Sequence, residues 1–85
     1  MRGLCDDAQV HWDDLRYALA VARARTLSAA AEALGVSHTT VGRRLRALEE
    51  HLGVRLFDAG VEGFTPTDAG RDLVAVAERM ETETL

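Results

Sequence analysis

Apolar side chains recur at helical spacing through the first 52 residues of the chain. Two stripes have neighbours three or four residues apart: Leu15, Leu19 and Ala22, and then Val41, Leu45, Leu48 and Leu52. An alanine-rich segment lies between them. The pattern predicts three helices, near residues 13–24, 28–34 and 37–52.

Capping residues indicate where the second and third helices begin and end. Ser28 is a suitable cap for the second helix, with Leu27 folding beneath it as a hydrophobic staple. Gly35 stops that helix, because glycine takes a positive φ at no steric cost, and Ser37 caps the third. The short turn between them predicts a helix-turn-helix in which Val41 docks one helix on the other.

The pattern changes after the third helix. Val54, Leu56 and Phe64 have strand-like spacing on either side of a glycine-rich link. This spacing predicts a short β-hairpin, the wing of a winged helix. Gly60 and Gly63 leave a plain loop as the alternative. The predicted fold is all-α with one small β-wing.

A last helix is predicted over residues 67–84. Two caps are possible: Thr67 itself, or Thr65 with Pro66 in the first turn and Asp68 closing a capping box. The apolar stripe of this helix is narrow and heptad-like, and its outer face is acidic, which favours pairing with a second copy. The residues expected at that dimer interface are Leu73, Val76, Ala77 and Met80.

Length and charge limit what such a chain can do. Its 85 residues allow one small domain, with a flexible leader expected over 1–11, a winged helix-turn-helix over 12–66 and a linker helix over 67–85. The net charge of −4 argues against binding that is driven by phosphate attraction alone. Residues 38–57, however, carry four arginines against two acids, whereas residues 58–85 carry two arginines against seven. Positive charge is therefore concentrated around the third helix.

Several classes of function lack the residues they need. Cys5 is the single cysteine, so we expect no disulfide within the chain, no Cys/His metal cluster and no cofactor. The absence of an apolar signal segment or span predicts a soluble, cytoplasmic protein. An enzyme is not expected, because the consecutive residues 49–51 (EEH) point in different directions on a helix and no phosphate-binding glycine loop is present.

Three strings carry a resemblance to a known family. They are LRYALAVARARTLSAAAEALGVS, LRALEEHLGVRLF from Leu45 to Phe57, and TDAG from Thr67 to Gly70. With them the chain resembles, from Asp14 to about Met80, the N-terminal DNA-binding domain of LysR-type transcriptional regulators. The resemblance implies a winged helix-turn-helix whose linker helices pair antiparallel in a homodimer. It also implies binding to an interrupted palindrome in double-stranded DNA, and a sensory domain for a small-molecule inducer beyond Leu85.

The third helix supplies the expected DNA contacts. Val41 and Leu45 must face inward, so the outward face would meet the major groove. By the resemblance, the base contacts are His38, Thr39, Gly42 and Arg43, and the phosphate candidates are Ser37, Thr40 and Arg44. Arg43 is the strongest candidate, because a guanidinium pairs bidentately with guanine.

The wing departs from the pattern of the family. Arginines are usual near the positions of Ala59, Glu62 and Thr65, whereas these residues are uncharged or acidic. Glu62 would repel a phosphate, so weak wing contact is expected. The alternative function is a winged-helix module that binds protein, with the acidic wing and the last helix as its interface.

Overall fold

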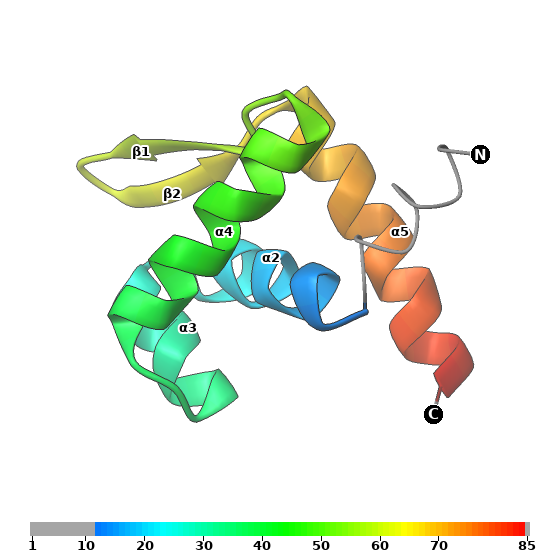
Figure 1. Ribbon diagram of the computed structural model, residues 1–85, viewed down its shortest axis with the longest axis horizontal. Coiled ribbons are helices and arrows are strands. Elements are labelled where there is room, and N and C mark those ends of the chain that lie inside the picture. Colours follow the sequence, from blue (N-terminus) through cyan, green and yellow to red (C-terminus); the bar gives the residue numbers. More distant parts are fainter. Residues whose placement is uncertain (1–11, 85) are drawn as a thin grey trace.

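The computed structural model describes residues 12–84, and it has the predicted fold of helices with one small wing (Figure 1). The leader expected over residues 1–11 and Cys5 lie outside the described residues. The elements are α2 (Trp12–Ala24), α3 (Leu27–Leu34), α4 (His38–Leu52), β1 (Phe57–Gly60), β2 (Gly63–Pro66) and α5 (Asp68–Thr84). The four predicted helices are therefore confirmed within one residue of their expected bounds, and the predicted hairpin is present.

The helix ends confirm two predictions and correct one. Ser37 caps α4 and accepts the backbone N–H of Thr40, and Gly35 ends α3 with a φ of 75°. The cap of α3, however, is Thr26, whose Oγ1 accepts the backbone N–H of Ala29 at 3.1 Å. The prediction of a Ser28 cap with a Leu27 staple is wrong. Both hydroxyl residues can cap a helix, and the extended backbone of Thr26 places its side chain where the cap is needed.

The main core lies where α2, α3 and α4 meet. Val41, Leu45 and Leu48 face inward from α4, and Val41 has no exposed surface. Opposite them are small or flat side chains that let the helices approach closely: Tyr17, Ala18, Val21, Ala30 and Ala31. Burial of this stripe fixes the rotation of α4 about its axis, and so it determines which residues face outward.

The segment after α4 is held by a carboxylate from within that helix. Glu49 accepts the backbone N–H groups of Leu56 at 2.8 Å and Phe57 at 3.3 Å. Leu56 is almost fully buried, but Val54 is 44% exposed and precedes the first strand. The expected strand start at Val54 is therefore wrong. Its apolar character suggested a strand, whereas the Glu49 contacts place the start of the sheet at Phe57.

The wing is a two-stranded antiparallel hairpin. Phe57 pairs with Pro66, and Gly60 pairs with Gly63, which leaves a two-residue turn at the tip. This register excludes the plain-loop alternative. Val61 at the tip is fully exposed.

The start of α5 explains the TDAG string. Thr67 is the cap: its Oγ1 accepts the backbone N–H of Gly70 at 3.1 Å and donates to the carbonyl of Arg55 at 2.6 Å. A Cβ at Gly70 would lie 2.0 Å from the carbonyl oxygen of Leu56. Only glycine therefore lets α5 pack against the segment that enters the wing. The alternative cap at Thr65 is excluded.

The inner face of α5 packs along α2. Ala77 is fully buried with Leu15 and Leu19, and Leu73 and Met80 are partly buried around them. The prediction of Ala77 as a dimer-interface residue is therefore corrected: α2 covers it within the same chain, and it is not available to a second copy. A bidentate contact from Arg23 to Glu81, at 2.9 and 3.2 Å, adds to the packing and lowers the pKa of Glu81.

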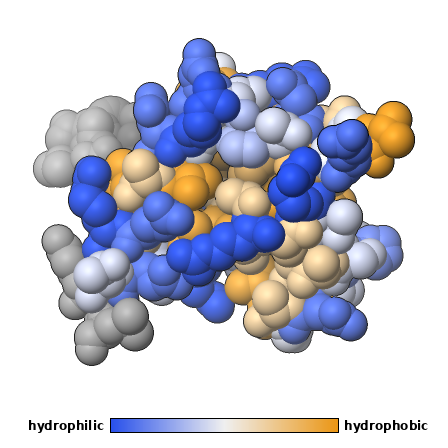
Figure 2. All heavy atoms as spheres, turned by 180° about the vertical axis from the view of Figure 1, so that it is seen from behind, coloured by the Kyte–Doolittle hydropathy of each residue, from blue (hydrophilic) through white to orange (hydrophobic). Residues whose placement is uncertain are grey.

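Figure 2 shows the molecule from the side opposite Figure 1, with hydrophobic residues gathered between hydrophilic ones. A hollow between α2, α3 and the end of α5 is lined by apolar residues from the first two helices, with arginines and Glu81 at its edge. The apolar surface on this side is therefore divided by charges. Within residues 12–84, no helix is long and apolar enough to cross a membrane.

Candidate nucleic-acid interface

The outward face of α4 brings the four predicted base-contact residues together. His38, Thr39 and Arg43 are exposed, and Gly42 is half-buried. All four line one hollow, together with Leu27, Arg46, Ala47 and Glu50. The grouping follows from helical geometry, because burial of Val41 and Leu45 on the inner side of α4 leaves positions 38, 39, 42 and 43 together on the other side. The structure thus groups these residues, and their contact with bases stays a prediction.

The capped start of α4 lies at one end of this face. The Oγ of Ser37 accepts the backbone N–H of Thr40 at 3.2 Å, and the two hydroxyl oxygens are 2.9 Å apart. Ser37 is exposed and Thr40 is half-buried. Amide groups and hydroxyls at a helix start suit a phosphate, since the helix dipole favours negative charge there.

Arg44 behaves differently from its neighbour Arg43. Its guanidinium donates to Asp14 of α2 at 2.9 Å and lies over the ring of Tyr17, 4.7 Å from the centroid. The hydrogen bond to Asp14 raises the pKa of Arg44 above its ordinary value, and the charge of that carboxylate adds to the effect. Arg44 thus holds α4 against α2. Its predicted phosphate contact would have to compete with Asp14.

Arg46 is a candidate that the sequence analysis missed. It is exposed and lines the same hollow as Arg43, one helical turn further along α4. No ion pair is recorded for either arginine within residues 12–84. The sequence could have predicted this position, because Arg46 follows Arg43 by three residues and residues three apart on a helix are neighbours on its surface. The face therefore carries two arginines beyond His38 along α4.

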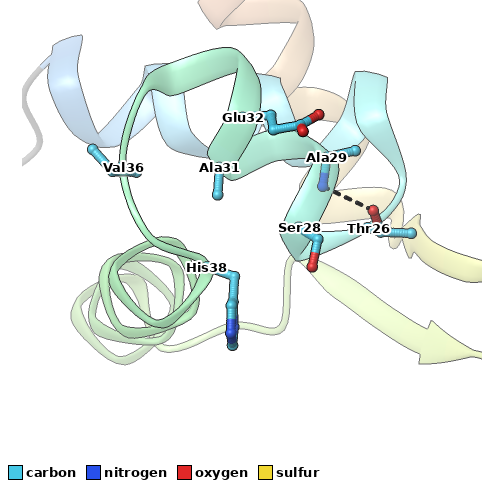
Figure 3. A pocket seen from close by; sticks show the side chains of 7 residues that line it. All are labelled: Thr26, Ser28, Ala29, Ala31, Glu32, Val36 and His38. Atoms are coloured by element: carbon cyan, nitrogen blue, oxygen red, sulfur yellow. Dashed lines mark hydrogen bonds between the residues drawn. The ribbon is translucent and has the colours of Figure 1, made fainter.

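A second hollow adjoins this surface at His38, which lines both hollows. Figure 3 shows His38 at the start of α4 and Ser28 in the first turn of α3 pointing to the same open side, beside Thr26, which caps α3. Glu32 also lines this hollow. Polar groups from the beginnings of both helices therefore lie on one continuous surface.

The wing carries no cation of its own. Asp58 and Glu62 are exposed on it, and so are the two uncharged residues Ala59 and Thr65. Arg55 precedes the first strand and is 3.7 Å from Asp58. Among the described residues no three His, Cys, Asp or Glu side chains are placed to hold a metal ion. The arrangement is thus a polar and cationic surface on α4 beside an acidic hairpin.

Comparison with known proteins places this domain in a family. The family model for bacterial regulatory helix-turn-helix proteins of the lysR family matches residues 12–71. The chain is 42% identical over 66 residues to the HTH-type transcriptional regulator TfdS of Cupriavidus pinatubonensis, which covers 78% of this chain and 22% of that protein. It is 44% identical over 62 residues to the regulator PtxR of Pseudomonas aeruginosa, covering 73% and 20%. The chain spans about a fifth of the length of these curated relatives.

Solved structures give the same result. The DNA-binding domain of CbnR in complex with DNA matches with a TM-score of 0.81 and 35% identity, over 88% of this chain and 86% of that one. The BenM domain in complex with benA site 1 DNA matches with a TM-score of 0.83 and 25% identity, over 88% and 84%. The named relatives are transcriptional regulators, and none is named as an enzyme. The chain belongs to the LysR family of bacterial regulatory helix-turn-helix proteins.

Proposed function

We propose that this protein is a sequence-specific DNA-binding transcriptional regulator that inserts α4 into the major groove. The observation that carries the proposal is the outward face of α4, where Arg43 and Arg46 stand beside a capped helix start in a domain that matches DNA-bound relatives. This face is exposed and free of carboxylate partners among the described residues, so it is available to a nucleic acid. Because its proposed target is bacterial DNA, the protein acts in the cytoplasm.

The side chains of this face have distinct roles in the proposal. Arg43 pairs bidentately with guanine, His38 donates to a purine, and the methyl group of Thr39 packs against a thymine methyl. Gly42 lets the backbone approach the bases. Ser37 and Thr40, with the first amides of α4, bind phosphates and fix the register of the helix on the duplex. Arg44 contacts a phosphate only when its guanidinium breaks the hydrogen bond to Asp14.

The proposed target is an interrupted palindrome that is read by a homodimer. Ala77 is buried in one chain, so the face of α5 that meets a second copy is the opposite one, around Val76, which is 40% exposed. On that face Asp72 and Arg79 are exposed and have no recorded ion pair within residues 12–84. In an antiparallel pair with its two-fold axis between Ala75 and Val76, Asp72 of each copy lies opposite Arg79 of the other.

Charge reversal on α5 tests this dimer. Asp72→Arg should weaken association, because like charges then meet across the axis, and the double variant Asp72→Arg with Arg79→Asp should restore it. Sedimentation over a range of concentrations gives the dissociation constant. If the single and double variants associate as the parent does, this face of α5 is not the interface.

The DNA-binding function itself is tested by selection. A random-sequence duplex pool is passed through several rounds of binding to the chain, and the recovered fragments are sequenced. We expect enrichment of one half-site in inverted repeat, and binding to it that weakens steeply with salt. A pool that stays random after selection would overturn the proposal and favour the protein-binding alternative. An inducer site requires residues beyond this chain and is proposed only for a longer protein.

A further inference from the structure

Arg25 has a backbone conformation that is unusual for a residue with a side chain. Its φ is 73°, and among residues 12–84 it is the only non-glycine residue with a positive φ. It follows the last turn of α2, where its N–H donates to the carbonyl of Val21 at 2.8 Å. Glycine is the common residue at such a helix end, because a Cβ is strained in the left-handed region. An outlier of this kind calls for a functional reason.

The backbone of Arg25 joins the helical part of the domain to the wing. Its carbonyl accepts the N–H of Phe64 at 2.7 Å. The adjoining Gly63 is so close that a Cβ there would lie 2.6 Å from the carbonyl oxygen of Arg25. Both contacts use main-chain atoms, and glycine at position 25 would make them equally well. The structural role of this junction therefore does not explain why an arginine occupies it.

The side chain of Arg25 is oriented by the wing but not neutralised by it. Its Nε donates to the carbonyl of Phe64 at 3.2 Å. No carboxylate partner of Arg25 is recorded in the described part of the chain, and the residue is exposed. A guanidinium has five N–H donors in a rigid fork, so the four on its two Nη atoms are left for a ligand. They suit a phosphate, which guanidinium binds in a planar, two-point geometry.

The position of Arg25 connects the two parts of the DNA-facing surface. It immediately precedes Thr26, which shares a hollow with Ser28 and His38 (Figure 3). On its other side it is bonded to β2 of the wing. The wing itself has Asp58 and Glu62 but no cation. Arg25 is thus a cation that lies between the cap of α3 and β2 of the wing.

We infer that Arg25 binds a DNA phosphate at the base of the wing and supplies the positive charge that the hairpin lacks. The inference rests on the proposed DNA-binding function and deepens it. A strained backbone is tolerated at this position because the arginine side chain, fixed through Nε by Phe64, contributes to binding. DNA backbone that passes the start of α3 would then be held by Arg25 from the wing side and by Ser28 from the helix side.

Replacement of Arg25 by glycine distinguishes an effect on DNA binding from an effect on the stability of the fold. Arg25→Gly keeps the main-chain bonds and relieves the left-handed strain, so the melting temperature should not fall. Affinity for a duplex selected from the random pool should fall roughly tenfold, the usual effect of losing one hydrogen bond to a charged group. The slope of log affinity against log salt should become shallower by about one, because one fewer counterion is released. The matched control is Arg16→Ala, which removes the same charge from the hollow between α2, α3 and α5.

The salt slope decides the outcome, because a change in stability alone does not alter the number of phosphates that are neutralised. An unchanged slope for Arg25→Gly overturns the inference, whatever happens to the melting temperature. A slope that falls equally for Arg16→Ala also overturns it, because the effect is then one of net charge. Arg43→Ala, measured in parallel, separates this failure from failure of the proposed function. If Arg43→Ala weakens binding and Arg25→Gly does not, only the role of Arg25 is lost; if neither does, DNA binding itself is in question.

Discussion

The outward face of α4 and the wing are built in different ways, and the sequence analysis expected strong DNA contact from the first and weak contact from the second. The face of α4 is set by burial on its opposite side, which leaves Arg43 and Arg46 outward and unpaired within the described residues. The wing is set by main-chain bonds and by glycine at a close approach. Its exposed side chains do not determine its shape, and they are acidic or neutral. A winged-helix fold therefore does not imply a cationic wing.

The same lesson holds for two adjacent arginines of α4. Arg43 is exposed at the hollow, whereas Arg44 donates to Asp14 and lies over Tyr17. Consecutive residues on a helix point about 100° apart, so one faces solvent while the next meets α2. Sequence charge alone treats them as equal. The structure leaves Arg43 on the exposed face that we propose for recognition, and it gives Arg44 a role in holding α4 against α2.

The largest effect on stability is expected from a substitution at Gly70, where α5 packs against the segment that enters the wing. Gly70→Ala places a Cβ against the carbonyl of Leu56, and the backbone on both sides must move. We expect a loss of roughly 1–3 kcal/mol of unfolding free energy, as for other overpacked sites. The matched control is Gly60→Ala, where the nearest atom to the new Cβ is 3.7 Å away. Thermal unfolding of both variants measures the difference, and equal melting temperatures would contradict this account of the TDAG string.

A change of charge on the wing tests whether the hairpin approaches DNA. Glu62→Arg should tighten binding severalfold and steepen the salt slope by about one, because a cation replaces an anion beside the phosphates. Glu62→Gln, which only removes the repulsion, should give a smaller gain. Mobility-shift titrations at several salt concentrations provide both numbers. If affinity and slope stay the same in both variants, the wing does not approach DNA.

Stability measurements can sharpen the contrast between the two adjacent arginines. Arg44→Ala should lower the unfolding free energy by about 1 kcal/mol, because it removes a charge-assisted hydrogen bond and an aromatic contact at a partly exposed site. Arg43→Ala should stay within about 0.5 kcal/mol of the parent, as surface substitutions usually do. Urea unfolding of the two variants measures both values. An equal loss in both would show that Arg43 is also held by the fold.

Apart from Arg43→Ala, the smallest change in unfolding free energy is expected for a substitution at Gly42 of α4. A Cβ at Gly42 would have as its nearest neighbour the flexible end of Leu27, at 3.4 Å, so alanine fits there. Gly42→Ala should therefore stabilise the helix by roughly 0.5–1 kcal/mol. Its DNA affinity should nevertheless fall, because the added methyl group stands between α4 and the bases. Unfolding and binding measured on one preparation would test this, and a gain in both would place the DNA away from Gly42.

Much of this molecule was predictable from local signals. The helices, Ser37 as a cap and the grouping of His38, Thr39, Gly42 and Arg43 all follow from periodicity and capping chemistry. Tertiary contacts decided the rest. Burial of Ala77 depends on how α5 packs on α2. The periodic pattern of α5 predicts an apolar face, but it does not say whether that face packs on α2 of the same chain or on α5 of a second copy. The partner of Arg44 is 30 residues away in the sequence, and the bond from Arg25 to Phe64 spans 39 residues.

The central claim is that the outward face of α4 reads DNA sequence, and the most direct measurement is base discrimination by Arg43→Ala. Affinities of this variant, the parent and Arg44→Ala are measured on the selected duplex and on duplexes with each single base pair changed. The account predicts that Arg43→Ala loses about 1–3 kcal/mol of discrimination at one base pair of each half-site, while Arg44→Ala keeps the full preference of the parent. Unchanged discrimination in Arg43→Ala at every position would contradict the claim.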